Sequence, residues 1–69
     1  KGRGPVEPFG LAETRELQRL LRRAGLYDAE IDGIMGAGTR AAVKAAQIKF
    51  GLPADGYPTS ELVQRLRRL

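Results

Sequence analysis

The sequence has no cysteine, no histidine and only one serine among its 69 residues. Without cysteine or histidine, the chain can form neither a disulfide nor a His/Cys zinc site, so its core must come from helix packing. The same absences remove the commonest nucleophiles and general bases of enzymes. Ser60 lies where we expect the first turn of a helix, which accounts for it without a catalytic role. We therefore expect no catalytic residue, no cofactor and no metal ion.

Long apolar runs are also absent. No segment is long and apolar enough to span a bilayer, and no signal-peptide pattern is present. A chain of 69 residues allows one small domain. Residues 1–10 contain three glycines and two prolines, which is typical of a linker. We expect a piece of a longer protein, with a linker at residues 1–10 and a folded domain at residues 11–69.

The charge balance is basic, with 12 Lys and Arg against 8 Asp and Glu. Such a balance raises nucleic acid and other polyanions as partners. Many of these cations lie at predicted helix ends, as Arg22 and Arg23 do. A cation at the C-terminal end of a helix interacts favourably with the helix dipole and stabilises the helix by roughly 0.3–1 kcal/mol. The segment 25–36 between the first two predicted helices is much longer than the turn of a helix-turn-helix motif. We therefore expect no nucleic-acid partner. If the chain did bind nucleic acid, its affinity for nucleic acid would fall steeply as salt is added.

Apolar residues at helical spacing predict three helices and leave short extended pairing inside the loops open. The first helix is predicted at residues 11–24 and the second at residues 37–50. The third begins at Ser60, after Thr59 as its N-cap. The predicted buried positions are Thr14, Leu17, Leu20, Leu21 and Ala24, then Thr39, Ala42, Val43, Ala46, Gln47 and Phe50, then Leu62, Val63, Leu66 and Leu69. The predicted fold class is all-α, a small three-helix bundle.

A short pattern occurs twice between these helices. The two copies read Gly25-Leu26, Asp32-Gly33 and Thr39, then Gly51-Leu52, Asp55-Gly56 and Thr59. Glycine can end a helix in the left-handed conformation, and aspartate in a turn can accept hydrogen bonds from the amides that follow it. We also expect Gly36 and Gly38 to bring the backbone close to its neighbours. The repeat predicts two Asp-Gly turns, each of which leads into a helix.

These segments resemble the peptidoglycan-binding domain 1 family over residues 11–69. The resemblance rests on Glu16 to Leu21, Ile31 to Gly36, Thr39 to Val43, Gln47, and Gly51 to Gly56. It implies a three-helix fold, in agreement with the helical spacing. It also implies an accessory module that holds a larger cell-wall hydrolase against peptidoglycan. The ending at residues 55–59 resembles the C-terminal module of some bacterial lytic murein transglycosylases.

The resemblance implies a monomer in the cell envelope, periplasmic or extracellular, that binds glycan and stem peptide without membrane insertion. A shallow groove where the two Asp-Gly turns meet the second and third helices would suit such a ligand. The predicted ligand-binding residues are Ile34, Met35, Thr39, Arg40, Gln47 and Tyr57. In this hypothesis Ile34 and Met35 form an apolar wall, and Tyr57 stacks on a sugar or packs on a stem peptide. Arg40 pairs with a carboxylate, while Thr39 and Gln47 form hydrogen bonds.

A structural role is an open alternative for each of these residues. Ile34 also suits a core position, and Thr39 also suits a helix cap. Gln47 could bind only backbone groups, Tyr57 could pack structurally, and Arg40 could lie on a solvated helix face. At the level of function, the alternative is a protein–protein interaction module of the same fold, which would bind a defined polypeptide and not the wall.

Overall fold

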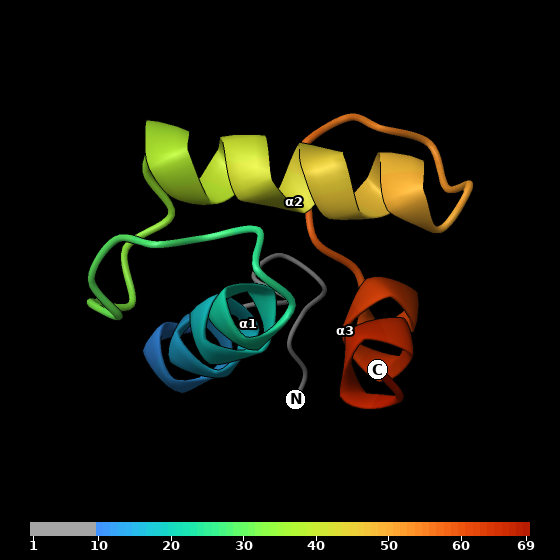
Figure 1. Ribbon diagram of the computed structural model, residues 1–69. Coiled ribbons are helices and arrows are strands. Elements are labelled where there is room, and N and C mark those ends of the chain that lie inside the picture. Colours follow the sequence, from blue (N-terminus) through green and yellow to red (C-terminus); the bar gives the residue numbers. More distant parts are fainter. Residues whose placement is uncertain (1–9) are drawn as a thin grey trace, which may run out of the picture.

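The computed structural model describes residues 10–69, so the predicted linker lies outside the described part except for its last residue and stays a prediction. The helices are α1 (Leu11–Arg23), α2 (Ala37–Lys49) and α3 (Ser60–Arg67). In Figure 1, α2 runs across the other two helices, and α1 packs against both α2 and α3. No strand occurs within the described residues. The prediction of an all-α three-helix bundle is confirmed.

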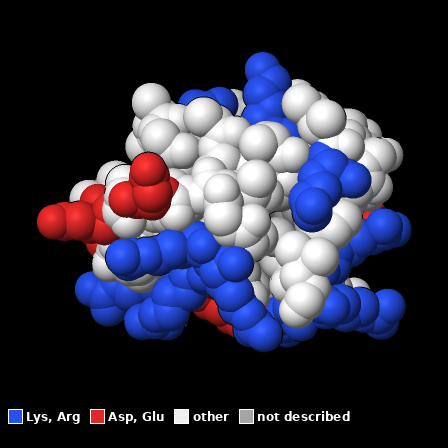
Figure 2. All heavy atoms as spheres, in the orientation of Figure 1, with Lys and Arg blue, Asp and Glu red and all other residues white. Residues whose placement is uncertain are grey.

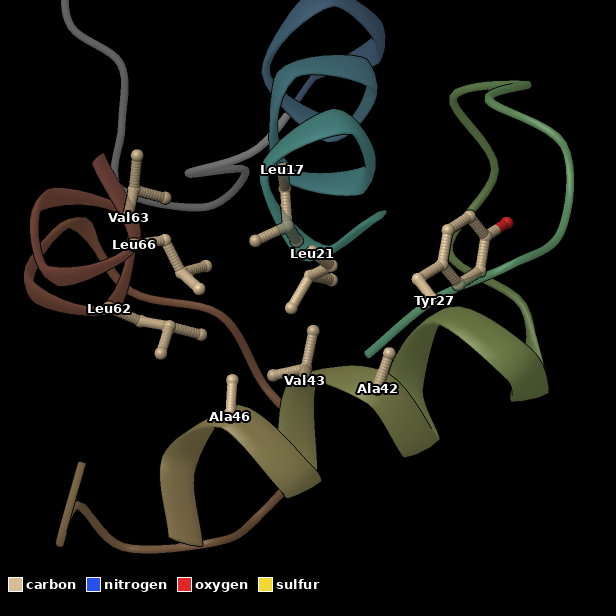
Figure 3. Packing of buried hydrophobic residues seen from close by; sticks show 9 residues of the cluster. All are labelled: Leu17, Leu21, Tyr27, Ala42, Val43, Ala46, Leu62, Val63 and Leu66. Carbon is tan, nitrogen blue, oxygen red and sulfur yellow. The ribbon is translucent and has the colours of Figure 1, made fainter. Parts of the chain in front are cut away.

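One apolar cluster holds the three helices together (Figure 3). Its members are Leu17, Leu21, Tyr27, Ala42, Val43, Ala46, Leu62, Val63 and Leu66. Leucines from α1 and α3 face the small side chains of α2. The helical spacing predicted every member except Tyr27, which lies in the loop after α1. The predicted positions Leu20, Ala24 and Phe50 are partly buried and pack against the cluster.

Leu69 was predicted to be buried, and this prediction is wrong. Its side chain is 52% exposed, whereas Leu66 is 1% exposed. The physical reason is that α3 ends at Arg67, so the helical spacing that would bring position 69 back to the core is not continued.

The ends of α1 and α2 have the same geometry. Gly25 and Gly51 follow the two helices with φ values of 80° and 72°, which glycine adopts without strain. The amides of Leu26 and Leu52 each donate to a carbonyl of the last helical turn at 2.8 Å, which is the Schellman motif. Both leucines pack against the apolar cluster. The Gly-Leu helix ends expected from the repeat are confirmed.

The starts of α2 and α3 differ from one another. Thr59 is the N-cap of α3, and its Oγ1 accepts from the Leu62 amide at 3.2 Å, as predicted. The N-cap of α2 is Gly36, and Thr39 is the third residue of the helix, so the capping role for Thr39 is wrong. The close approach expected at Gly36 and Gly38 is also wrong, because a Cβ on either would meet no neighbouring atom within 4 Å.

Replacing Leu66 with alanine is expected to lower the free energy of unfolding by about 2–5 kcal/mol, the range for removing a buried leucine side chain. The matched change Leu69→Ala, at an exposed position, is expected to change it by less than about 0.5 kcal/mol. Urea unfolding followed by circular dichroism measures both. Equal losses in the two variants would contradict the position of the α3 end.

Candidate functional site

A buried glutamine of α2 holds the second Asp-Gly turn. Gln47 is 3% exposed. Its Nε2 donates to Asp55 Oδ1 at 3.0 Å and to the Tyr57 carbonyl at 2.9 Å, and its Oε1 accepts from the Gly56 amide at 2.9 Å. Asp55 Oδ1 also accepts from the Tyr57 amide at 3.0 Å. One side chain therefore pairs with three polar groups of the turn, which uses both of its N–H donors and its acceptor.

A buried glutamine of α1 holds the first turn in the same way. Gln18 is 0% exposed, and its Oε1 accepts from the Gly33 amide at 2.9 Å. Its Nε2 lies 3.1 Å from both Asp32 Oδ1 and the Ile34 carbonyl oxygen. Asp32 Oδ1 accepts from the Ile34 amide at 2.9 Å. We call each glutamine together with its Asp-Gly turn a glutamine clamp.

Two further side chains complete the first clamp. Thr39 Oγ1 lies 3.0 Å from Gln18 Nε2 and 3.3 Å from the Ile34 carbonyl oxygen. Tyr27 Oη lies 3.3 Å from Gln18 Nε2 and donates to the Glu30 carbonyl at 2.7 Å. The two N–H groups of Gln18 thus face four oxygens at 3.0–3.3 Å. This buried polar network explains why Tyr27 lies against the core with its hydroxyl pointing away from the apolar cluster (Figure 3).

Gln18 was not predicted from the sequence as part of a site. The signal was present, because each helix that precedes an Asp-Gly turn carries a glutamine on its buried side. Gln18 directly follows Leu17 in α1, and Gln47 directly follows Ala46 in α2. A buried glutamine needs partners for its amide, and a turn rich in free peptide groups supplies them.

The clamps also lower the pKa of both aspartates. For Asp32 the amide of Ile34 is the largest cause, followed by the side chain of Gln18. For Asp55 the corresponding causes are the amide of Tyr57 and then the side chain of Gln47. Hydrogen bonds donated to a carboxylate stabilise its charged form. Both aspartates are therefore held as anions by the groups that they order.

Arg40 and Tyr57 form an exposed pair beside the second clamp. The Arg40 guanidinium carbon lies 4.7 Å from the centre of the Tyr57 ring, which is a cation–π contact. Tyr57 is 60% exposed. Gly56 has a φ of 79°, which glycine adopts without strain, and a Cβ there would lie at the ordinary contact distance of 3.6 Å from the Arg40 carbonyl oxygen. The clamp binds both peptide groups of Tyr57 and so positions its ring.

The other predicted site residues divide into exposed and buried groups. Ile34 is 63% exposed, so the alternative that it belongs to the core is wrong. Met35 is partly buried and packs against the apolar cluster. Thr39 and Gln47 are each 3% exposed, with their polar atoms engaged in the clamps. Gln47 binds the Asp55 carboxylate as well as backbone, so the interpretation that it binds only backbone groups is wrong.

Two hollows on the described surface lie near the second and third helices. The larger, of about 540 Å³, is lined by Phe50, Glu61, Gln64, Arg65, Arg68 and Leu69. The smaller, of about 240 Å³, is lined by Gln47, Leu52, Pro53, Asp55, Thr59 and Glu61. Of the six predicted site residues, only Gln47 lines either of these hollows. Within residues 10–69, no three His, Cys, Asp or Glu side chains are grouped so as to hold a metal ion. None of the three helices in this part is long and apolar enough to cross a bilayer.

The fold and the clamps define a class of protein: a small all-α module built from two turn-and-helix units, each locked by a glutamine. The chain belongs to the family described as "Putative peptidoglycan binding domain", which matches residues 11–66. The resemblance stated from the sequence is confirmed.

Three proteins similar to this chain in sequence or structure show how much of a longer protein it covers. A spore cortex-lytic enzyme of Bacillus cereus is 43% identical over 51 residues, which are 74% of this chain and 20% of the enzyme. The "Putative OxPP cycle protein OpcA" of Synechococcus elongatus is 45% identical over 56 residues, 81% of this chain and 13% of that protein. The crystal structure of SltB3 from Pseudomonas aeruginosa in complex with NAG-anhNAM-pentapeptide matches with a TM-score of 0.82 and 48% identity, over 97% of this chain and 18% of SltB3. The chain thus spans a fifth or less of each of these proteins.

Replacing Gln18 with methionine is expected to lower the free energy of unfolding by about 1–3 kcal/mol, because the change keeps the volume but leaves polar groups of the first turn unpaired. Gln64→Met, at an exposed position of α3, is the matched control and is expected to have little effect. Urea unfolding compares the two variants. Identical midpoints for Gln18→Met and wild type would contradict the role of the clamp.

Acid is expected to weaken the fold through the two aspartates. Their folded pKa values lie below the unfolded value of about 3.9, so the unfolded chain binds more protons and stability rises with pH in this range. The contribution is present above about pH 4 and is lost as the pH falls through the folded pKa values. A variant with Asp32→Asn and Asp55→Asn keeps an acceptor at each position without the charge. Its thermal midpoint should therefore change less between about pH 2 and 5.

The control for this pH series is Asp28→Asn, which removes an exposed carboxylate that belongs to neither clamp. It is expected to keep the wild-type slope of thermal midpoint against pH. If the double variant also kept the wild-type slope, the clamps would not be the source of the acid sensitivity.

Proposed function

We propose that this chain is a non-catalytic module that binds peptidoglycan and holds a larger cell-wall hydrolase against it. Membership of the peptidoglycan-binding family supports peptidoglycan as the partner. Similarity to a spore cortex-lytic enzyme supports the association with wall hydrolysis. The observation that carries the proposal is the Arg40–Tyr57 pair, which a buried clamp holds in place on the surface of a chain from this family.

The chemistry of this pair suits a glycan with peptide branches. The Tyr57 ring offers an apolar face for stacking on a sugar ring or for packing on a stem peptide. The Arg40 guanidinium offers a planar set of donors for a stem-peptide carboxylate. Ile34 adds an exposed apolar side chain next to the first clamp. Because the clamps order both turns before binding, the ligand need not supply the free energy for ordering them.

In this proposal Thr39 and Gln47 support the binding surface from beneath and do not contact the ligand. Their polar atoms already hold the turns that carry Ile34 and Tyr57. Met35 contributes the part of its side chain that remains accessible. The proposed contact residues are therefore Ile34, Met35, Arg40 and Tyr57.

The proposed context is a longer protein of the bacterial cell envelope, periplasmic or extracellular. Residues 1–10 would link the module, residues 11–69, to a catalytic domain such as a lytic murein transglycosylase or another wall hydrolase. The module would act as a monomer. Weak binding by the module is sufficient in this arrangement, because tethering raises the effective concentration of the catalytic domain at the wall.

A protein–protein interaction module of the same fold is the second candidate function. The observation in its favour is the 45% identity to OpcA, a relative whose name refers to the OxPP cycle and not to the cell wall. A module of this kind would bind a defined polypeptide and would not sediment with peptidoglycan.

Co-sedimentation of the module with insoluble peptidoglycan tests the proposed function. The wild type is expected to pellet at both low and moderate salt. The variant Arg40→Ala with Tyr57→Ala is expected to bind about tenfold more weakly at both, as for two central contact residues. The matched control is Lys44→Ala with Ile48→Ala, which removes an exposed cation and an exposed apolar side chain from α2, the helix that carries Arg40. It is expected to pellet like the wild type.

Each other outcome has a definite meaning. Pelleting that the Arg40 and Tyr57 changes leave unaltered would support the function and move the binding surface elsewhere. Absence of wild-type pelleting at every salt concentration would contradict peptidoglycan binding and favour the polypeptide partner. Circular dichroism of each variant shows whether a loss of binding follows from unfolding.

A further inference from the structure

Four arginines form a stripe along the solvent side of α1. Arg15, Arg19, Arg22 and Arg23 are all exposed. At about 100° per residue, they fall within an arc of about 100° around the helix axis, away from the side that buries Leu17. Figure 2 shows Lys and Arg side chains gathered along the lower part of the molecule, where Figure 1 places α1 and α3. We call these four residues the α1 arginine stripe.

The acidic residues of α1 are occupied elsewhere. Glu13 accepts from the amide of Gly10 at 3.1 Å, and Glu16 forms an ion pair with Arg67 of α3 at 2.6 Å. On α3, Arg65 pairs with Glu61 at 3.2 Å. Across residues 10–69, no ion pair involves the α1 arginine stripe. The arginines of α3 are thus largely paired within the module, and those of the stripe are not.

The stripe has an electrostatic cost that the module itself offsets only in part. Like charges three and four residues apart repel one another on a helix surface. The dipole of α1 compensates Arg22 and Arg23, which lie in its last turn, but Arg15 and Arg19 lie too far from that end. Arg15 is also close to the first clamp, where its charge contributes to the lowered pKa of Asp32. An anionic partner would relieve the repulsion along the whole stripe.

We propose that the α1 arginine stripe is a second peptidoglycan-contacting surface, which binds the carboxylates of stem peptides. The inference rests on the proposed function. From Arg15 to Arg23 the stripe is about 12 Å long. Arg15, Arg19 and Arg23 follow one i, i+4 ridge at intervals of about 6 Å, and Arg22 lies beside the end of this ridge. A single row of this kind fits anions that are spaced along a polymer better than it fits a broad flat surface. Guanidinium groups bind carboxylates through paired, parallel hydrogen bonds.

The two surfaces are expected to respond differently to salt. The Arg40–Tyr57 pair combines its charge with an aromatic contact on an ordered turn, so part of its binding is insensitive to ionic strength. The four arginines of the stripe are all exposed, and their attraction to carboxylates is screened within about 10 Å at 0.1 M salt. Binding should therefore have a salt-sensitive part from the stripe and a salt-tolerant part from the pair.

The test compares two variants that remove the same charge. Arg19→Gln with Arg23→Gln removes one mid-helix and one last-turn cation from the stripe. Lys44→Gln with Lys49→Gln makes the equivalent change on the exposed side of α2. The stripe variant is expected to bind peptidoglycan about three- to tenfold more weakly at low ionic strength, the size expected for two exposed ion pairs. At about 0.5 M salt the difference should fall below about twofold, and the control should stay within about twofold throughout.

Peptidoglycan whose carboxylates have been converted to amides provides the second arm. Amidation also removes the carboxylate that Arg40 would bind, so wild-type binding to this material at low salt is expected to fall at least to the level of the stripe variant on native peptidoglycan. On the amidated material itself, the wild type and the stripe variant are expected to bind equally, because the stripe has no carboxylate left to contact. Unchanged wild-type binding to the amidated material would overturn the proposal.

Other outcomes separate this proposal from the proposed function. If the stripe variant and the α2 control bound peptidoglycan equally weakly, the loss would be an effect of net charge. That outcome would overturn the stripe proposal and leave the proposed function standing. If the wild type bound duplex DNA, and the stripe variant lost this binding but kept full binding to peptidoglycan, nucleic acid would be the partner of the stripe. That outcome would also overturn the stripe proposal. Absence of wild-type binding to peptidoglycan at every salt concentration would overturn both the stripe and the proposed function.

Discussion

Each Asp-Gly turn of this module depends on one buried glutamine amide. The turns present peptide N–H and C=O groups toward the protein interior, where unpaired polar groups are costly. Gln18 and Gln47 pair with these groups and with the turn aspartates, and each does so from the helix that precedes its turn. Since the same turn leads into the next helix, a clamp fixes how two successive helices enter the core.

The clamps also explain how a chain of 69 residues without disulfides can present ordered loops. A domain of this size buries a small core and has little stability to spare. Polar atoms that hold the loops are placed inside, on Gln18, Thr39 and Gln47, while Ile34 and Tyr57 remain exposed on the turns. The surface proposed for ligand binding is therefore positioned from beneath by side chains that a ligand does not reach.

Much of the fold could be predicted from the sequence, because helical spacing and glycine positions act locally. The Gly25 and Gly51 helix ends and the Thr59 cap each involve residues within a few positions of one another. Leu69 was mispredicted because the pattern continues after the helix has ended. Thr39 was mispredicted because threonine near a helix start is typical of a cap, whereas here its hydroxyl meets a glutamine 21 residues earlier.

The sequence by itself determined three helices, two Asp-Gly turns, the apolar stripes and the family. Tertiary structure alone decided that Ile34 is exposed, that Gln18 joins Tyr27 and Asp32, and that Arg40 lies over Tyr57. The physical reason is that periodicity shows which side of a helix is buried but not which distant group a buried amide or an exposed cation will meet. Those partners depend on how the turns pack against the helices, and this packing follows only when the whole core has closed.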